Sequence, residues 1–222
     1  MSEFFLGQSE LVSPDVVIPL VFGAFFLATV MLGISSAARG RKRTHVNLLE
    51  LANRLGLTPE GLELGSVFRV SRPELRGSYR GRRIRVFSYT TGSGKNRTQW
   101  CAIATEVANR TGMSLRISRE NFFTRAGRRF GIDDVQIGDA NFDRDFYVKS
   151  DRPEYLRAAM IPEIRHRLQQ VWVSGTSGSL SVEGAELRYA EIGSFSDASK
   201  CRRLADFADS VCDLGDVIEA AL

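Results

Sequence analysis

The feature that most constrains this chain is an uncharged, apolar run of 23 residues near the N-terminus, from Val16 to Ala38. As a helix, this run would be about 35 Å long, whereas the hydrocarbon core of a bilayer is about 30 Å thick. A buried helix of a soluble protein normally keeps a polar stripe, and this run has none. A cleaved signal peptide would place its bases before the apolar run, not after it. The sequence therefore predicts a transmembrane helix over residues 16–38.

The charges on the two sides of this run differ in sign. All 30 Lys and Arg residues follow position 38, whereas the preceding residues contain only the acids Glu3, Glu10 and Asp15. Bases that flank a membrane helix stay on the cytoplasmic side. We therefore expect a short tail outside the cell (1–15), a basic juxtamembrane segment (39–45) and a cytoplasmic domain (46–222). The bases closest to the apolar run are Arg39, Arg41, Lys42 and Arg43.

The cytoplasmic part changes from strand-like to helix-like patterns along the chain. Apolar and β-branched runs separated by turn residues predict strands over 67–70, 84–90, 98–107, 113–118 and 143–150. Helical spacing predicts helices that begin near residues 46, 153, 162 and 197, with a hairpin at 179–192 between the last two. The expected fold class is α+β, with a mostly antiparallel sheet and helices packed on it.

Three short motifs suggest known sites but lack essential residues. Residues 51–62 resemble a helix-turn-helix, but the second helix would contain two glutamates and two glycines and no base before Arg69. Residues 92–95, Gly-Ser-Gly-Lys, lack the first glycine of a phosphate-binding loop and fit a hairpin tip. Residues 139–145 resemble a calcium loop without its central glycine. We expect none of the three to form its site.

An arginine-rich stretch is the most unusual feature of the domain. Seven arginines lie between residues 69 and 85, with Glu74 as the one acid among them. Anionic lipid head groups would attract such a surface, while a solvated strand face paired with acids elsewhere would also explain it. Nucleic acid fits less well, because only Tyr79 and Phe87 are available for stacking. The residues expected to contact lipid or a partner are Arg39, Arg41, Lys42, Arg43, Arg80, Arg82 and Arg83.

Catalytic signals are missing from the sequence. The two histidines, His45 and His166, are not part of a metalloprotease or hydrolase motif. The three cysteines are widely spaced, which suggests single thiols in a reducing compartment and not a disulfide framework. We therefore expect no enzyme activity, no cofactor and no bound metal.

The segment from Phe142 to Asp151 resembles a Phe-Asp-x-x-Phe-x-Val-x-Ser strand found in uncharacterised bacterial proteins that are anchored to the membrane by one helix. In those proteins, two helices and a closing hairpin follow this strand. The resemblance implies the α+β architecture and a bacterial inner membrane location, with no known activity. The resulting hypothesis is a membrane-anchored cytoplasmic interaction or scaffold domain. The alternative is an accessory single-helix subunit of a larger integral membrane complex, so a protein partner is expected in either case.

Overall fold

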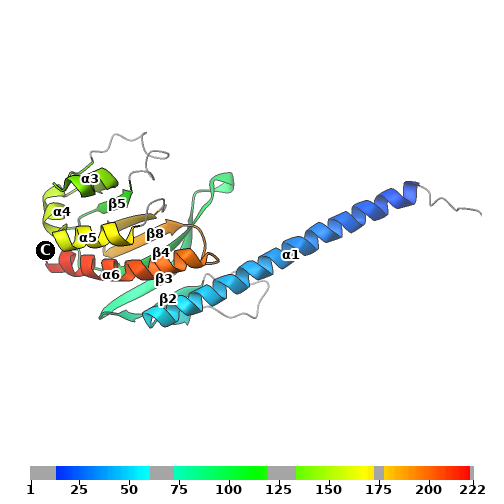
Figure 1. Ribbon diagram of the computed structural model, residues 1–222, viewed down its shortest axis with the longest axis horizontal. Coiled ribbons are helices and arrows are strands. Elements are labelled where there is room, and N and C mark those ends of the chain that lie inside the picture. The colour runs from blue at the N-terminus through cyan, green and yellow to red at the C-terminus, as the bar shows by residue number, and fades with distance from the viewer. Residues whose placement is uncertain (1–13, 61–72, 120–133, 173–177, 221–222) are drawn as a thin grey trace, which may run out of the picture. The chain divides into compact units, whose positions relative to one another are not determined.

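The computed structural model describes residues 14–60, 73–119, 134–172 and 178–220 (Figure 1). Within the first helix, it describes the side chains of residues 22 and 23 and of those from residue 25 onward. Contacts within the chain divide it into two compact units, Met1–Lys42 and Arg43–Leu222. The division falls inside helix α1, which extends from Pro14 to Leu55.

In the first unit, α1 exposes large apolar side chains to solvent. They occupy neighbouring positions such as 25, 26 and 27, and again 30, 31 and 32, so they point to all sides of the helix. Their exposed fractions are between 40% and 70%. These side chains are Phe22, Phe25, Phe26, Leu27, Val30, Met31, Leu32 and Ile34.

The prediction of a transmembrane helix over residues 16–38 is contradicted by the structure. In the part of the chain that the structure describes, no helix is both long enough and apolar enough to cross a membrane. The continuous apolar stretch of α1 with described side chains covers residues 25–38, or about 21 Å of helix, and Arg39 then begins the charged segment. A crossing helix needs about 20 consecutive apolar residues. The predicted fold class is therefore corrected to α+β without a membrane span among these residues.

The second unit is built on one antiparallel sheet, to which the described residues contribute eight strands in the order β1-β2-β3-β4-β8-β7-β5-β6. Neighbouring strands are antiparallel throughout. The pairing of β4 with β8 joins the first four strands to the last four. The strands are β1 (Thr58–Glu60), β2 (Glu74–Tyr79), β3 (Arg82–Thr91), β4 (Thr98–Glu106), β5 (Leu115–Arg119), β6 (Phe146–Ser150), β7 (Gly178–Glu183) and β8 (Glu186–Ile192).

Helices α5 and α6 pack on one face of this sheet, side by side, with α6 over β4 and β8 (Figure 1). The last turns of α1 join the same core through the buried residues Leu48, Leu51 and Leu55. Among the described residues, the helices of this unit, besides the end of α1, are α3 (Ala140–Asp145), α4 (Pro153–Ala159), α5 (Pro162–Val171), α6 (Ala198–Ala220) and the short 3-10 helix η1 (Gly94–Asn96).

An aromatic cluster connects the sheet to the helices. The ring of Trp172 meets Phe146, Tyr189 and Phe207 edge-on, with ring centroids 5.2 to 5.5 Å apart. All four side chains are almost completely buried. Edge-to-face contacts of this kind add about 0.5–1.5 kcal/mol per pair beyond the burial of apolar area. The cluster therefore fixes how β6, β8 and α6 pack together.

The structure corrects some of the predicted boundaries. The strand expected over 143–150 begins only at Phe146, because Asp139 caps the short helix α3 by accepting hydrogen bonds from the backbone of Asn141 and Phe142. The calcium-like motif is thus a helix cap. The helix-turn-helix does not form, since residues 58–60 are strand β1. The expected strand over 67–70 lies outside the described residues.

Candidate interaction surfaces

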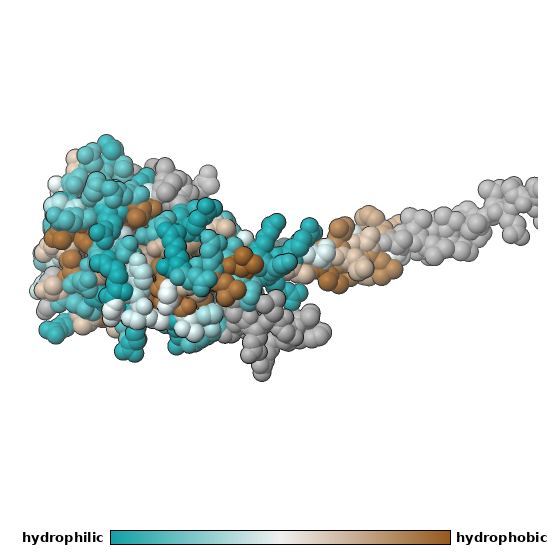
Figure 2. Space-filling view, turned by 60° about the horizontal axis from the view of Figure 1, so that its bottom comes forward, coloured by the Kyte–Doolittle hydropathy of each residue, from teal (hydrophilic) through white to brown (hydrophobic). Residues whose placement is uncertain are grey.

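The first candidate surface is residues 22–43 of α1, called here the apolar–basic segment. Figure 2 shows its hydrophobic side chains as a brown stretch of the helix. The four bases that follow are exposed, and none of them forms an ion pair with a described residue. Arg39 donates a hydrogen bond from Nε to the carbonyl oxygen of Ser35, at 3.2 Å. The structure thus places four of the predicted contact residues in solvent: Arg39, Arg41, Lys42 and Arg43.

Helix α6 presents a row of acids, the acidic stripe, which the sequence analysis did not single out. Its members are three or four residues apart and therefore lie on one face of the helix. Bases from other elements reach this face: Arg54 of α1 contacts Asp206 at 2.6 Å, and Arg167 of α5 contacts Asp213. The acidic stripe consists of Asp206, Asp209, Asp213, Asp216 and Glu219.

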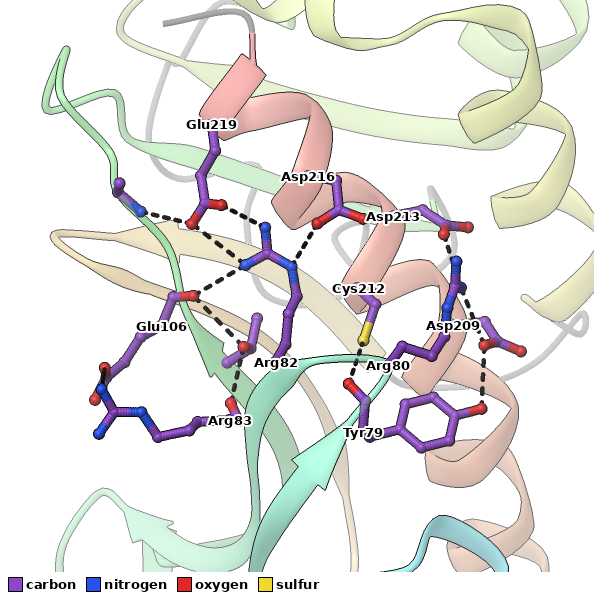
Figure 3. Close-up of polar contacts among 12 residues, drawn as sticks. Tyr79, Arg80, Arg82, Arg83, Glu106, Asp209, Cys212, Asp213, Asp216 and Glu219 are labelled. Atoms are coloured by element: carbon purple, nitrogen blue, oxygen red, sulfur yellow. Dashed lines mark hydrogen bonds and ion pairs between the residues drawn. The ribbon is translucent and has the colours of Figure 1, made fainter.

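Arg82 forms the most extensive contacts with the acidic stripe (Figure 3). Its Nε donates to Asp216 at 2.7 Å, and its terminal nitrogen donates to Glu219 at 2.6 Å. The other terminal nitrogen donates to the second carboxylate oxygen of Glu219 and to the carbonyl oxygen of Glu106, both at 3.3 Å. Only 11% of the Arg82 side chain is exposed. The predicted lipid-contact residue is therefore engaged inside the domain.

The backbone of α6 is adapted to this contact. A Cβ at residue 215 would lie 2.9 Å from the Cζ of Arg82, so Gly215 leaves the space in which the guanidinium lies against the helix. Glycine within a helix costs about 1 kcal/mol relative to alanine, and the close approach explains its presence here. Hydrogen bonds from Arg82 and from the backbone N–H of Ala108 lower the pKa of Glu219. Burial alone would lower the pKa of Arg82, but its bonds to Glu219 and Asp216 outweigh burial and raise it.

Arg80 is also paired with the acidic stripe, from an unusual backbone conformation. It precedes Gly81 in the two-residue turn between β2 and β3, where both residues have positive φ, 51° for Arg80 and 80° for Gly81. Its guanidinium contacts Asp209 at 3.2 Å and Asp213 at 2.8 Å (Figure 3). The hydroxyl of Tyr79 also donates to Asp209. The turn is thereby fastened to α6.

Arg83 differs from its two neighbours. Its side chain is 85% exposed, and its one ion pair with a described residue, Glu106, is long at 3.8 Å. It lines a solvent-open polar hollow together with Arg82, Glu106 and Glu219. Three bases and three acids line this hollow, so it has no excess charge to attract an anion. Contact of Arg80, Arg82 or Arg83 with lipid or a partner stays a prediction, and Arg83 is the member of this group that is available for it.

The described residues offer little for redox or metal chemistry. No group of three or more metal-ligating side chains occurs among them. Burial raises the pKa of Cys101 and of Cys201 to about 12, which keeps both thiols protonated and unreactive at neutral pH. The buried carboxylate of Glu191 is held by Lys200 at 3.3 Å and Arg203 at 2.6 Å, an arrangement that joins β8 to α6.

Comparisons with known proteins give one structural neighbour. No family model matches the chain, and no curated protein matches it. Among solved structures, the chain is similar to the crystal structure of the mycobacterial trehalose monomycolate transport factor A, TtfA, at 14% sequence identity and a TM-score of 0.49. The similarity covers 81% of this chain and 93% of that one. This neighbour is a transport factor, and the likeness to it is weak.

Proposed function

We propose that this protein is a membrane-associated binding module. In this proposal, the apolar–basic segment enters lipid, and the α+β domain acts by binding a protein partner and not by catalysis. The observation that carries the proposal is the exposure of eight large apolar side chains on α1 between Phe22 and Ile34. Burying a side chain of this kind fully gains about 1.5–3 kcal/mol, so covering all eight would gain on the order of 10 kcal/mol.

The arrangement of these side chains favours lipid over a protein groove. A groove on a partner covers one face of a helix, with apolar residues at positions such as i, i+3, i+4 and i+7. Here the apolar residues include the consecutive triplets 25–27 and 30–32, which point in all directions around the axis. A helix that is apolar all round needs an apolar environment on every side, and a lipid phase provides one.

The charge pattern supports the same conclusion. The four exposed bases begin at Arg39, immediately after the last apolar residue, Ala38. Bases next to a lipid-inserted segment meet the anionic head groups, where each contributes about 1 kcal/mol. Stable membrane binding commonly combines an apolar insertion with a basic patch, and residues 22–43 contain both. The predicted location at the bacterial inner membrane, with the domain on the cytoplasmic side, stays a prediction.

Flotation of the full chain with phosphatidylcholine vesicles tests the proposal. The variant Phe25→Gln/Leu27→Gln/Met31→Gln/Leu32→Gln removes four exposed apolar side chains and keeps a good helix former at each position. We expect it to lower the partition into vesicles by roughly a thousandfold or more, because each lost apolar side chain weakens insertion by about 1–2 kcal/mol.

The matched control places four glutamines in the same helix without removing a large apolar side chain. It is Ser35→Gln/Ser36→Gln/Ala37→Gln/Ala38→Gln, and we expect a partition much closer to that of the unchanged protein. Equal flotation of both variants would contradict insertion through residues 22–34. The unchanged protein could also form a dimer or larger homo-oligomer without detergent or vesicles. If only the first variant dissociates, a second copy of the chain and not lipid buries these side chains.

A further inference from the structure

The hairpin between β3 and β4 projects beyond the strands on both sides of it. Strand β2 pairs with β3 only as far as Val86, and β8 pairs with β4 only from Trp100 onward. Residues 90–98 are therefore a two-stranded ribbon without a sheet neighbour among the described residues. An isolated two-stranded ribbon is at best marginally stable, so its persistence needs a local cause.

Local contacts provide this cause. The rings of Tyr89 and Trp100 stack at the base of the ribbon with centroids 6.1 Å apart, and Trp100 donates from Nε1 to the hydroxyl of Thr91 at 2.8 Å. At the tip, Asn96 donates its backbone N–H to Ser93 at 3.1 Å, within the turn that contains η1. A Cβ on Gly92 would overlap the carbonyl of Asn96, and Gly92 has a φ of 77°. The tip is thus preformed, which lowers the entropic cost of binding through it.

The charge of this tip is positive and unopposed. Lys95 and Arg97 are exposed, and neither forms an ion pair with a described residue. Between Phe87 and Thr105 the sequence contains no acid at all. Arg80 and Arg82, by contrast, are matched by carboxylates on α6. The hairpin tip is therefore a projecting basic feature of the domain, and its charges are not paired with carboxylates of the described residues.

From this geometry we infer that the β3–β4 hairpin tip is a second membrane contact, in which Lys95 and Arg97 bind the phosphates of anionic lipid head groups. This inference rests on the proposed membrane association, which brings the domain to a head-group surface. Single-stranded nucleic acid is the other polyanion, but it needs an open aromatic face for stacking. One face of Tyr89 is stacked on Trp100, and the guanidinium of Arg188 lies 5.2 Å from the same Tyr89 ring.

The test compares the full chain on vesicles of phosphatidylcholine with and without phosphatidylglycerol. The quantity measured is the ratio of the two partition coefficients, which isolates the contribution of anionic head groups. Lys95→Gln/Arg97→Gln is expected to lower this ratio by about 25-fold, which corresponds to roughly fivefold per base. The matched control is Lys149→Gln/Arg152→Gln, which removes two exposed bases that form no ion pairs with described residues. Its net charge equals that of Lys95→Gln/Arg97→Gln. We expect it to change the ratio less than twofold.

Each remaining outcome overturns a distinct statement. Equal changes in the two variants would show a general charge effect, and no change in either would show that these bases do not contribute to anionic-lipid binding. Both results would overturn the hairpin contact. Loss of binding to a single-stranded oligonucleotide in Lys95→Gln/Arg97→Gln, with an unchanged vesicle ratio, would assign the tip to nucleic acid and also overturn it. Failure of the unchanged protein to bind phosphatidylcholine vesicles would instead overturn the proposed function, whatever the hairpin does.

Discussion

Two arginine-rich regions of this chain have the same sequence character and opposite surroundings. The bases after Ala38 are exposed on α1 without a carboxylate partner among the described residues. Arg80 and Arg82, on the β2–β3 hairpin, each contact two acids of α6. A cluster of bases in a sequence therefore does not by itself indicate a binding surface. Whether the bases are available for binding depends on whether the fold brings carboxylates within about 4 Å of them. Helix α6 does so for only one of the two regions.

Between the two arginine-rich regions, the largest effect should come from removing the unpaired bases. Arg39→Gln/Arg41→Gln/Lys42→Gln/Arg43→Gln is expected to weaken binding to anionic vesicles by about 4 kcal/mol, or roughly a thousandfold, because each base contributes about 1 kcal/mol at the head groups. The same variant should unfold in urea with an unchanged midpoint, since these side chains form no ion pair with any residue that the structure describes. A large loss of stability without a loss of vesicle binding would reverse the contrast between the two regions.

A smaller effect, on stability, is expected where the base is paired. Arg82→Ala should lower the free energy of unfolding by about 2 kcal/mol, because it removes the guanidinium that Asp216 and Glu219 share and uncovers α6 at Gly215. Arg83→Ala, one residue later, should cost less than about 0.5 kcal/mol, as expected for an exposed side chain with one long ion pair. Urea unfolding at neutral pH measures both. Similar losses for the two variants would mean that the contacts of Arg82 contribute little to the fold.

Much of the fold could be predicted from local sequence patterns. The apolar spacing of α6 and the hairpin around Gly184 were predicted because each depends on residues close in the chain. Strand β2 was missed because its sequence, Glu-Leu-Arg-Gly-Ser-Tyr, has one buried apolar residue, Leu75, and contains a glycine. The transmembrane prediction came from a run of apolar letters, and the described side chains do not support a span.

The contacts of the candidate site could be predicted less well from the sequence, for a physical reason. The pairing of Arg82 with Glu219 joins residues that are 137 positions apart, and no local pattern shows which face of α6 will meet the β2–β3 turn. One signal was present: the acids at 206, 209, 213 and 216 recur at helical spacing, which marks them as one surface. The left-handed conformation of Arg80 likewise follows from the register of β2 and β3, which the sequence patterns did not predict because β2 itself was missed.

The smallest effect concerns the protonation of the acidic stripe. The pKa of Glu219 is lowered from its ordinary value of 4.5, first by the hydrogen bond from Arg82 and then by the backbone N–H of Ala108. The charged carboxylate therefore stabilises the fold above about pH 4.5, and this contribution is lost as the pH falls through the lowered pKa. Glu219→Gln should reduce stability at pH 7 by less than about 1 kcal/mol, because the carboxylate is partly exposed and its attraction is screened.

Urea unfolding between pH 7 and pH 3 can measure this dependence, with Glu50→Gln as the control for an exposed acid of a helix without an ion pair to a described residue. The difference between the unchanged protein and Glu219→Gln should shrink as the pH falls below 4.5, since glutamine imitates the protonated acid and can still accept the bond from Ala108. The control should show a smaller difference at pH 7. A Glu219→Gln difference that stays constant down to pH 3 would mean that shape and not charge joins α6 to Arg82, and the contrast between the two arginine-rich regions would then rest on packing.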